Sequence, residues 1–305
     1  MTFVDPLPDL SDRTIVVTGA NAGLGRFAAE QLAAAGATVV LACRKPDRAD
    51  AAVSAIRAMY PDARLESVRL DLADLGSVTK AAEHARSLGG IDAVLCNAGC
   101  TGTSQRRTTV DGFELMMGVN HLGHFAFVAQ LMPALRPDAR VVSVGSIAHR
   151  RYPVDLDDLQ LADGFRSFRQ YGRSKSAVLM FAFELERRAH EAGRPLVSLA
   201  AHPGFSLDAL TPPRPDLDRP SGAFRALTRL GRPLFCQGKD AGAWPLVHAT
   251  AAPDAKGGDY WGPGGWQEVT GKPALAKTRP HVRDAAAAKA LWDESERLTG
   301  VSFAL

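Results

Sequence analysis

Cysteine, long hydrophobic runs and net charge are all scarce in this chain of 305 residues. Its four cysteines are too few for a disulfide framework at this length, so we expect them to be reduced and mostly buried. Cys96 and Cys100 have an x3 spacing rather than x2, and no second pair matches them, which disfavours a metal site. The other two are Cys43 and Cys236.

The hydrophobic runs are short. In the first half of the chain the longest, residues 37–43, is interrupted by Thr38 and falls far below the roughly 18 residues that a membrane helix needs. The opening sequence, MTFVDPLPDL, has neither a basic region nor a long apolar stretch, so it does not resemble a secretory signal. We therefore expect a cytoplasmic protein.

The charges of the chain nearly balance, with 36 Lys and Arg against 33 Asp and Glu and a formal net charge of +3. This small excess argues against a basic nucleic-acid-binding protein, so we expect a small-molecule partner and no nucleic acid. With 46% hydrophobic and 23% charged residues, the composition is that of a globular chain rather than a disordered one.

Short β-branched runs alternate with longer Ala- and Leu-rich stretches over the first 200 residues. This alternation predicts the α/β class: a Rossmann-type, doubly wound domain with a mainly parallel sheet and helices on both faces. Runs such as IVV, TVVLA and VVSV lack polar alternation, as expected for strands buried on both faces. The predicted strands are residues 14–18, 38–43, 65–70, 93–96, 140–144 and 196–200.

The last hundred residues have a different pattern. Residues 203–232 are rich in Pro and Arg, and the stretch 221–230 places Phe224, Leu227 and Leu230 on one helical face. Such an insertion is a mobile lid or a surface loop, and we favour a lid because long loops are usually functional or disordered. Beyond it we expect a helix near residues 239–250, a Gly- and aromatic-rich segment, GGDYWGPGGW, and a helix over about 283–298.

A glycine-rich turn follows the first predicted strand and leads directly into a helix. It reads TGANAGLG over residues 18–25. Glycines allow a tight turn and a close approach of the backbone to a pyrophosphate, and the helix N-terminus supplies N–H groups and a partial positive charge. An ordinary turn is the alternative, but the strand before it and the helix after it favour a phosphate site.

The G-x-x-x-G-x-G spacing of this turn resembles that of the short-chain dehydrogenase/reductase family, whose glycine turn is TGxxxGxG. The resemblance covers roughly residues 10–210, and it extends to an NAG sequence after the fourth strand and to an Asp-Leu pair after the third. It implies that the NAG turn supports the sheet and the adenosine side, and that Asp71 accepts a hydrogen bond from adenine. Taken alone, Asn97 is also typical of a turn and Asp71 of a solvated charge. The dinucleotide-binding residues that the resemblance implies here are Gly19, Asn21, Gly23, Leu24, Gly25, Asp71, Leu72, Asn97, Ala98 and Gly99.

The end of the second predicted strand indicates which dinucleotide binds. An NAD site usually places Asp or Glu about 20 residues past the glycine turn, to accept hydrogen bonds from the ribose 2′-hydroxyl. Here that position holds Ala42 and Cys43, and Arg44 follows, whose guanidinium suits a 2′-phosphate. We therefore expect NADP. NAD stays the alternative, because Asp47 and Asp50 lie close enough to fold back, and a solvated surface charge is the other reading of Arg44.

A Tyr and a Lys four residues apart lie in a predicted helix, so Tyr171 and Lys175 project from one face of it. Their position after the fifth strand matches the YxxxK motif of the family. The resemblance implies two further members of the catalytic set, Asn120 and Ser146. Ser146 lies in the run SIAH, which matches the SxAH of retinol-dehydrogenase-like members, and we prefer it to the alternative, Ser143.

These four residue types suit proton and hydride exchange at a carbonyl. A phenol has a pKa near 10, and an adjacent ammonium and a cationic nicotinamide ring both favour the phenolate. We expect Tyr171 to exchange a proton with the substrate oxygen, while Lys175 lowers its pKa and binds the nicotinamide ribose; both also belong to the cofactor site. Ser146 would hold and polarise the carbonyl, and Asn120 would anchor a water that joins Lys175 to solvent.

A His-Pro-Gly sequence follows the sixth predicted strand, and its Pro203 and Gly204 look like the family's PG turn over the nicotinamide. Members of this branch usually continue with a Thr or Ser that bonds the carboxamide or the pyrophosphate. This chain has Phe205 and then Ser206, and we expect Ser206 to take that role. His121 and His124 have a spacing that could bind zinc, but no further ligand stands at a suitable spacing, so we expect them to pack and predict no metal site.

The sequence thus predicts an NADP(H)-dependent oxidoreductase that interconverts a carbonyl and an alcohol. A dinucleotide sensor without catalytic activity is the alternative, although such proteins have typically lost the Tyr or the Lys. An epimerase of the extended branch is disfavoured by the glycine spacing. We predict a single domain over residues 1–305: a glycine-turn half at about 12–135, a catalytic half at about 136–205, and the lid with the C-terminal extension at about 206–305.

The likeness to retinol-type enzymes and the apolar face of residues 221–230 favour a lipophilic substrate. Arg225 and Arg229 lie opposite that face, which would suit a membrane surface, but lid or core packing is favoured. Homodimers are common in the family, so a homodimer is an alternative to a monomer.

Overall fold

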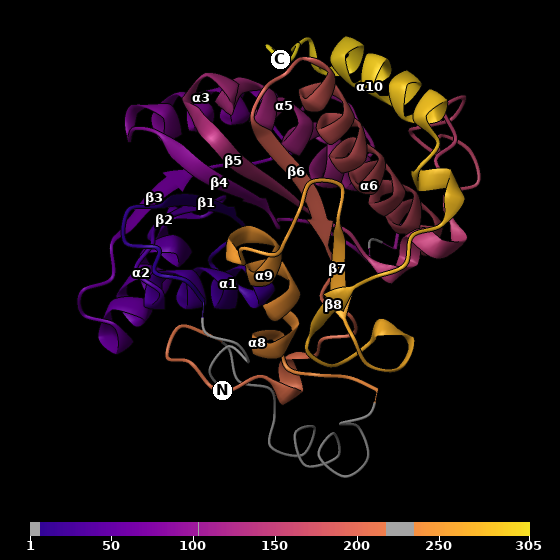
Figure 1. Ribbon diagram of the computed structural model, residues 1–305. Helices are drawn as coiled ribbons and strands as arrows, with labels where there is room; N and C mark the ends of the chain where they lie inside the picture. Colours follow the sequence, from indigo (N-terminus) through magenta and orange to yellow (C-terminus); the bar gives the residue numbers. More distant parts are fainter. Residues whose placement is uncertain (1–6, 103, 218–234) are drawn as a thin grey trace.

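The computed structural model describes residues 7–102, 104–217 and 235–305 (Figure 1). The predicted helical stretch 221–230 and half of the predicted lid insertion, residues 218–232, lie outside these residues. No helix of the described residues is long and apolar enough to cross a membrane.

One sheet contains all eight described strands, in the order β3-β2-β1-β4-β5-β6-β7-β8. Neighbouring strands are parallel except for β7 and β8, which pair antiparallel at one edge. The mainly parallel, doubly wound fold predicted from the alternating pattern is therefore confirmed. The strands are β1 (Thr14–Thr18), β2 (Thr38–Cys43), β3 (Leu65–Arg69), β4 (Ile91–Cys96), β5 (Leu135–Val144), β6 (Leu196–Ala201), β7 (Tyr260–Pro263) and β8 (Pro273–Leu275).

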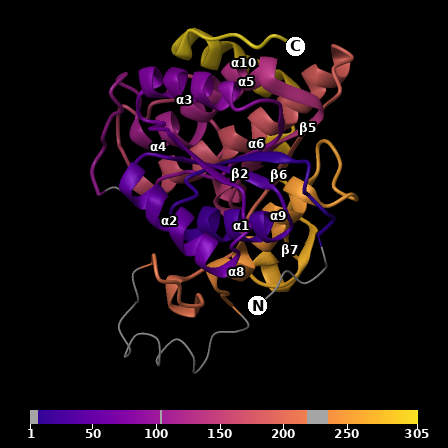
Figure 2. The ribbon, with the colours of Figure 1, turned by 90° about the vertical axis from the view of Figure 1, so that its left-hand side faces the viewer.

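Helices cover both faces of this sheet (Figure 2). One face packs against α1 (Gly23–Ala34), α2 (Pro46–Met59) and α9 (Trp244–Ala251), and the short α8 (Lys239–Gly242) lies beside α1. The other face packs against α3 (Leu75–Ser87), α5 (Gly123–Leu131), α6 (Ser167–Glu191) and α10 (Ala285–Thr299). A one-turn helix α4 (Leu115–Met117) and a π-helical turn η1 (Gly118–Leu122) lead into α5. The 3₁₀ turns are η2 (Met132–Ala134), η3 (Ile147–Arg151), η4 (Asp208–Leu210), η5 (Trp266–Glu268) and η6 (Pro280–Val282).

The local sequence explains where these elements form and end. The central strands β1 and β2 are buried along almost their whole length, because helices cover both of their faces. Helix α10 begins after Asp284, whose carboxylate accepts hydrogen bonds from the N–H groups of Ala286 and Ala287, and it ends at Gly300 in the left-handed conformation.

The C-terminal part differs from the sequence prediction in two places. The expected helix at residues 239–250 is divided into α8 and α9, with Pro245 in the first turn of α9, where its missing N–H costs nothing. The segment GGDYWGPGGW contributes β7, which the sequence pattern did not indicate because only four residues, one Gly and one Pro among them, form the strand.

A buried ion-pair network ties the segment after β6 to α1. The side chain of Arg26 is fully buried, and its guanidinium lies 2.6 Å from Asp216 and 3.0 Å from Glu30. Arg214 binds the same Glu30 at 2.6 Å. These charges are stabilising only as a complete set, because a buried charge without its partner is costly.

We expect Arg26→Met to lower the free energy of unfolding by about 3 kcal/mol, because Asp216 would stay buried without its partner. Urea unfolding measures the change. Arg297→Met is the matched control: Arg297 also pairs with a carboxylate, Glu294, but its side chain is exposed, so stability should hardly change. If the two substitutions lowered the free energy of unfolding equally, the importance assigned to the burial of the Arg26 ion pair would be contradicted.

Candidate active site

The glycine turn connects β1 to α1 and has little room for side chains. Gly19 and Gly23 have positive φ angles of 67° and 57°. A Cβ on Gly25 would lie 2.3 Å from Asn97 Nδ2 and 2.6 Å from the carbonyl oxygen of Gly19. Gly25 therefore allows the turn to pack against the segment after β4, whereas Gly23 leaves room on the outer side of the turn, where the nearest side chain is that of Lys239.

The NAG turn after β4 supports the glycine turn through Thr18. Asn97 Nδ2 donates to the carbonyl of Thr18 at 2.8 Å, and the N–H of Ala98 donates to Thr18 Oγ1 at 2.9 Å. His124 Nε2 lies 2.9 Å from the same hydroxyl, and its Nδ1 lies 3.1 Å from the carbonyl oxygen of Asn120. Burial lowers the pKa of His124 to about 4, so a neutral imidazole joins the glycine turn to the helix that bears Asn120.

The neighbouring His121 Nε2 lies 2.8 Å from Ser295 Oγ in α10. Burial lowers its pKa to about 3. Among the residues that the structure describes, no three His, Cys, Asp or Glu side chains form a group that could hold a metal ion.

A cavity of about 430 Å³ lies at the carboxyl ends of β1 to β4. Ligands of doubly wound sheets bind at this edge. Nine of the predicted dinucleotide-binding residues line the cavity: Gly19, Asn21, Leu24, Arg44, Asp71, Leu72, Asn97, Ala98 and Gly99. The donor set and the open side of the glycine turn fit a bound dinucleotide.

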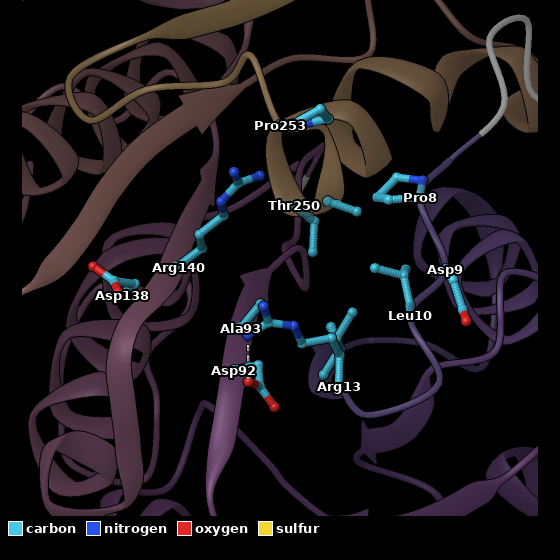
Figure 3. Close-up of a pocket in the computed structure, with 12 residues that line it drawn as sticks. Pro8, Asp9, Leu10, Arg13, Asp92, Ala93, Asp138, Arg140, Thr250 and Pro253 are labelled. Carbon is cyan, nitrogen blue, oxygen red and sulfur yellow. Dashed lines mark hydrogen bonds and ion pairs between the residues drawn. The ribbon is translucent and has the colours of Figure 1, made fainter.

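A second cavity, of about 360 Å³, lies at the opposite edge, where β1, β4 and β5 begin (Figure 3). Asp92, Arg13 and Arg140 in its lining pair with other groups of the protein. Asp92 accepts hydrogen bonds from Arg13 and Arg136, and Arg140 donates to backbone carbonyls of the α9 region, at Ala249 and Ala252. None of the predicted catalytic residues lines it.

Asn120 lies in the π-helical turn η1 and is joined to α6. Its Oδ1 accepts from the N–H of Cys100 at 2.8 Å, and its Nδ2 donates to Ser174 Oγ at 2.9 Å. Ser174 Oγ in turn donates to the carbonyl of Tyr171 at 2.8 Å. Single π-helical turns are frequent at functional sites, because the extra residue re-aims a side chain.

Tyr171 and Lys175 project from the same face of α6 toward the carboxyl end of β5. Lys175 Nζ donates to the carbonyl of Val144 at 2.7 Å and lies 5.9 Å from the centre of the Tyr171 ring. Tyr171 shares a side-chain hydrogen bond with Ser146. A Cβ on Gly99 would lie 3.1 Å from Asn120 Oδ1 and 3.7 Å from Lys175 Nζ. The fold therefore brings all four predicted catalytic residues together.

Burial shifts the pKa values of two side chains in this cluster. Burial lowers the pKa of Lys175 to about 8. It also raises the pKa of Tyr171, while the hydrogen bond with Ser146 acts in the opposite direction. With the protein groups alone, desolvation of the phenolate outweighs the hydrogen bond with Ser146, so the pKa of Tyr171 lies above its ordinary value. The expected lowering by Lys175 together with a cationic nicotinamide ring stays a prediction.

The two candidate serines occupy different environments. Ser146 lies two residues after the end of β5, and as the N-cap of the turn η3 its Oγ accepts from the N–H of Ala148 at 3.2 Å. Ser143 lies inside β5, and its Oγ is buried without a hydrogen-bond partner among the described residues.

The PG turn after β6 is supported by residues that the sequence did not indicate. His202 Nδ1 accepts from the N–H of Gly204 at 3.2 Å, and its Nε2 lies 3.2 Å from Glu268. Arg150, in the turn after Ser146, binds the same carboxylate at 2.5 Å. The segments that carry Ser146 and Gly204 are thus joined through one carboxylate.

No sequence signal marks Glu268. It lies in a glycine-rich loop and has a positive φ of 59°, which is strained for a residue other than Gly.

Seven predicted cofactor residues do not line the cavity of about 430 Å³: Gly23, Gly25, Tyr171, Lys175, Pro203, Gly204 and Ser206. Ser206 Oγ donates to the carbonyl of Pro203 at 3.0 Å and lies against Gly242 of α8. In this structure the Ser206 hydroxyl therefore makes a hydrogen bond within its own loop.

The fold and the site define a class: a dinucleotide-binding oxidoreductase with a Tyr-Lys pair at the carboxyl edge of a parallel sheet. The chain belongs to the short-chain dehydrogenase family, because the model of that family matches residues 13–206. The sequence resemblance is thereby confirmed. The protein is an oxidoreductase that acts on the CH–OH group of an alcohol or on the corresponding carbonyl.

Relatives match nearly the whole chain. A polyprenol dehydrogenase from Mus musculus is 37% identical, with 96% of this chain and 86% of the relative covered. Retinol dehydrogenase 13 from Homo sapiens is 33% identical, with 95% and 85% covered. A solved structure of an uncharacterized protein from Mycobacterium paratuberculosis is 36% identical and has a TM-score of 0.81, with 100% of this chain and 99% of that chain covered. These relatives support the retinol-dehydrogenase-like branch.

The buried ammonium of Lys175 should make folding stability depend on pH. Its pKa is about 8 in the folded chain, against about 10.4 for an exposed Lys. Between these two pKa values the unfolded chain binds more protons at this residue than the folded chain does. The contribution of Lys175 to the free energy of unfolding therefore rises with pH over this range and is lost as the pH falls toward 8. Lys175→Met should reduce the rise in the free energy of unfolding between about pH 8 and pH 10 by roughly 2 kcal/mol. Urea unfolding without dinucleotide measures this change.

Lys256→Met is the control for this measurement, since the side chain of Lys256 is exposed. A pH dependence that is the same in Lys175→Met and wild type would contradict the buried ammonium.

Proposed function

We propose that this protein is an NADP(H)-dependent oxidoreductase that interconverts a carbonyl and an alcohol of a lipophilic substrate, and that the whole chain works as one domain. The observation that carries the proposal is the cluster of Asn120, Ser146, Tyr171 and Lys175 beside the cavity at the carboxyl edge of the sheet. The dinucleotide would supply or accept the hydride. The cytoplasmic location inferred from the sequence stays a prediction.

Each residue of the cluster has a role that its contacts support. The Tyr171 hydroxyl exchanges a proton with the substrate oxygen, and Ser146, already hydrogen-bonded to it, holds and polarises the carbonyl. Lys175 is held at the end of β5 by Val144, within reach of the Tyr171 ring, where a positive charge favours the phenolate and ribose hydroxyls can bind. Asn120 holds α6 to the segment at Cys100. The proposal further assigns to it the anchoring of a water next to Lys175.

Preference for NADP rests on Arg44. This residue lines the cavity directly after β2, where an NAD site would have a carboxylate. Asp47, the first acidic residue after Arg44 in the sequence, is exposed in the first turn of α2 and does not line the cavity.

A lipophilic substrate is supported by the surface next to the PG turn. Phe205, Phe235 and Trp266 are exposed there, and the rings of Phe235 and Trp266 lie 5.5 Å apart, edge to face. Exposed aromatic groups of this kind suit an apolar ligand. The relatives named for polyprenol and retinol point to the same class of substrate.

Tyr171→Phe should reduce carbonyl reduction by at least about 10²-fold, because it removes the proton that the reaction needs. NADPH affinity should change little, since the ring and the surrounding contacts remain. Steady-state turnover and NADPH fluorescence measure the two effects. Tyr60→Phe, at an exposed position, is the control. Full activity of Tyr171→Phe would refute the role, and a wild type that binds NADPH but reduces no carbonyl of a graded chain-length series would favour a sensor.

Arg44→Ala should weaken NADPH binding by roughly tenfold and leave NADH binding nearly unchanged, because the lost hydrogen bonds are made to the 2′-phosphate. Arg48→Ala, an exposed change of equal charge in α2, is the control. Equal weakening of both dinucleotides by Arg44→Ala would contradict the assignment.

A further inference from the structure

We infer that Lys239 is a phosphate ligand in the dinucleotide site and that its ammonium binds the pyrophosphate above the glycine turn. This inference rests on the proposed function in one respect only, the binding of a dinucleotide. Lys239 lies more than two hundred residues beyond the glycine turn in the sequence, in a segment without a phosphate-binding motif.

The geometry places the ammonium over the open side of the glycine turn. A Cβ built on Gly23 would lie 3.4 Å from Lys239 Nζ and 3.6 Å from its Cδ. Gly23 has a positive φ of 57°, and no other heavy atom outside its chain neighbours is nearer to that position than this side chain. The missing Cβ of such a glycine is what allows a pyrophosphate to approach the backbone. Lys239 therefore borders the space that the phosphates would enter.

Backbone contacts fix the position of Lys239 relative to α1. Its N–H donates to Thr211 Oγ1 at 2.9 Å at the start of α8. The carbonyl of the next residue, Asp240, accepts from Gln31 Nε2 of α1 at 3.1 Å. A Cβ on Gly242 would lie 3.0 Å from Leu24 Cδ2, so α8 packs closely on the first turn of α1. The ammonium is thus presented to the turn by a fixed backbone.

The charges around the turn also favour an anion. The first turn of α1 contains no acidic side chain, and Ala22 before it provides no side-chain acceptor for the N–H groups. These N–H groups and the helix dipole attract negative charge, and a Lys ammonium beside them adds a point charge that binds phosphate well.

The carboxylate that Lys239 binds in this structure is that of Asp208, at 2.6 Å. The side chain of Asp208 is 68% exposed, so the pair is weak and a phosphate can replace the carboxylate. Asp208 then competes with the ligand for the same ammonium. Removal of the Lys239 ammonium and removal of the Asp208 carboxylate should therefore have opposite effects on the binding of the pyrophosphate.

The test compares Lys239→Met with Asp208→Asn. Titration calorimetry with ADP-ribose measures the pyrophosphate contact, and adenosine 2′-monophosphate measures the 2′-phosphate contact. We expect Lys239→Met to weaken ADP-ribose and NADPH binding by roughly tenfold, the loss of one charge-assisted hydrogen bond. Adenosine 2′-monophosphate should bind as to wild type. Asp208→Asn should bind ADP-ribose more tightly than wild type, by a fewfold.

Two controls separate this result from a change of fold or of overall charge. Lys239→Arg keeps the positive charge and should keep most of the ADP-ribose affinity. Lys256→Met has the same charge change as Lys239→Met but precedes β7, at the opposite edge of the sheet, and should bind ADP-ribose like wild type.

The inference is overturned if Lys239→Met binds ADP-ribose as tightly as wild type, or if it loses affinity for adenosine 2′-monophosphate to the same extent. It is also overturned if Lys239→Arg binds as weakly as Lys239→Met. A wild type that binds NADPH, together with any of these results, leaves the proposed function intact. A wild type that binds no dinucleotide refutes the proposed function and this inference together.

Discussion

The hydrogen bond from the buried ammonium of Lys175 to the carbonyl of Val144 holds the site together. It joins α6, which carries Tyr171, to the end of β5, which leads to Ser146. Burial of this charge is unfavourable, and the pKa of Lys175 is correspondingly lowered to about 8. Buried charges with shifted pKa values are frequent at functional sites, and Lys175 lies 5.9 Å from the centre of the Tyr171 ring, on which the proposed function places the proton transfer.

The glycine turn depends in a similar way on contacts made elsewhere in the chain. Thr18, Asn97 and His124 form a hydrogen-bonded chain that fixes the turn and reaches the helix of Asn120. From the other side, Lys239 borders Gly23. The segments that follow β4 and β6 therefore both border the glycine turn at the carboxyl edge of the sheet, because parallel strands end there side by side.

Local patterns were sufficient to predict most of the fold. The six apolar runs form β1 to β6, since strands buried on both faces leave an unbroken hydrophobic signal. The predicted start of β5 was wrong by five residues, because the strand begins at Leu135 with a mostly exposed segment. The pattern did not indicate β7 and β8, whose short sequences contain Gly and Pro and become strands only by pairing at the sheet edge. Nor did it indicate the contact of Glu268 with His202 and Arg150, which joins three distant loops.

By itself, the sequence determined the alternation of β1 to β6 with helices along the chain, the glycine turn and the placing of Tyr171 and Lys175 on one helix face, because each of these depends on residues close together in the chain. Only the tertiary structure decided that burial raises the pKa of Tyr171 and that Lys239 lies over Gly23. Desolvation and contacts between distant segments exist only once the chain is packed, so no local pattern records them.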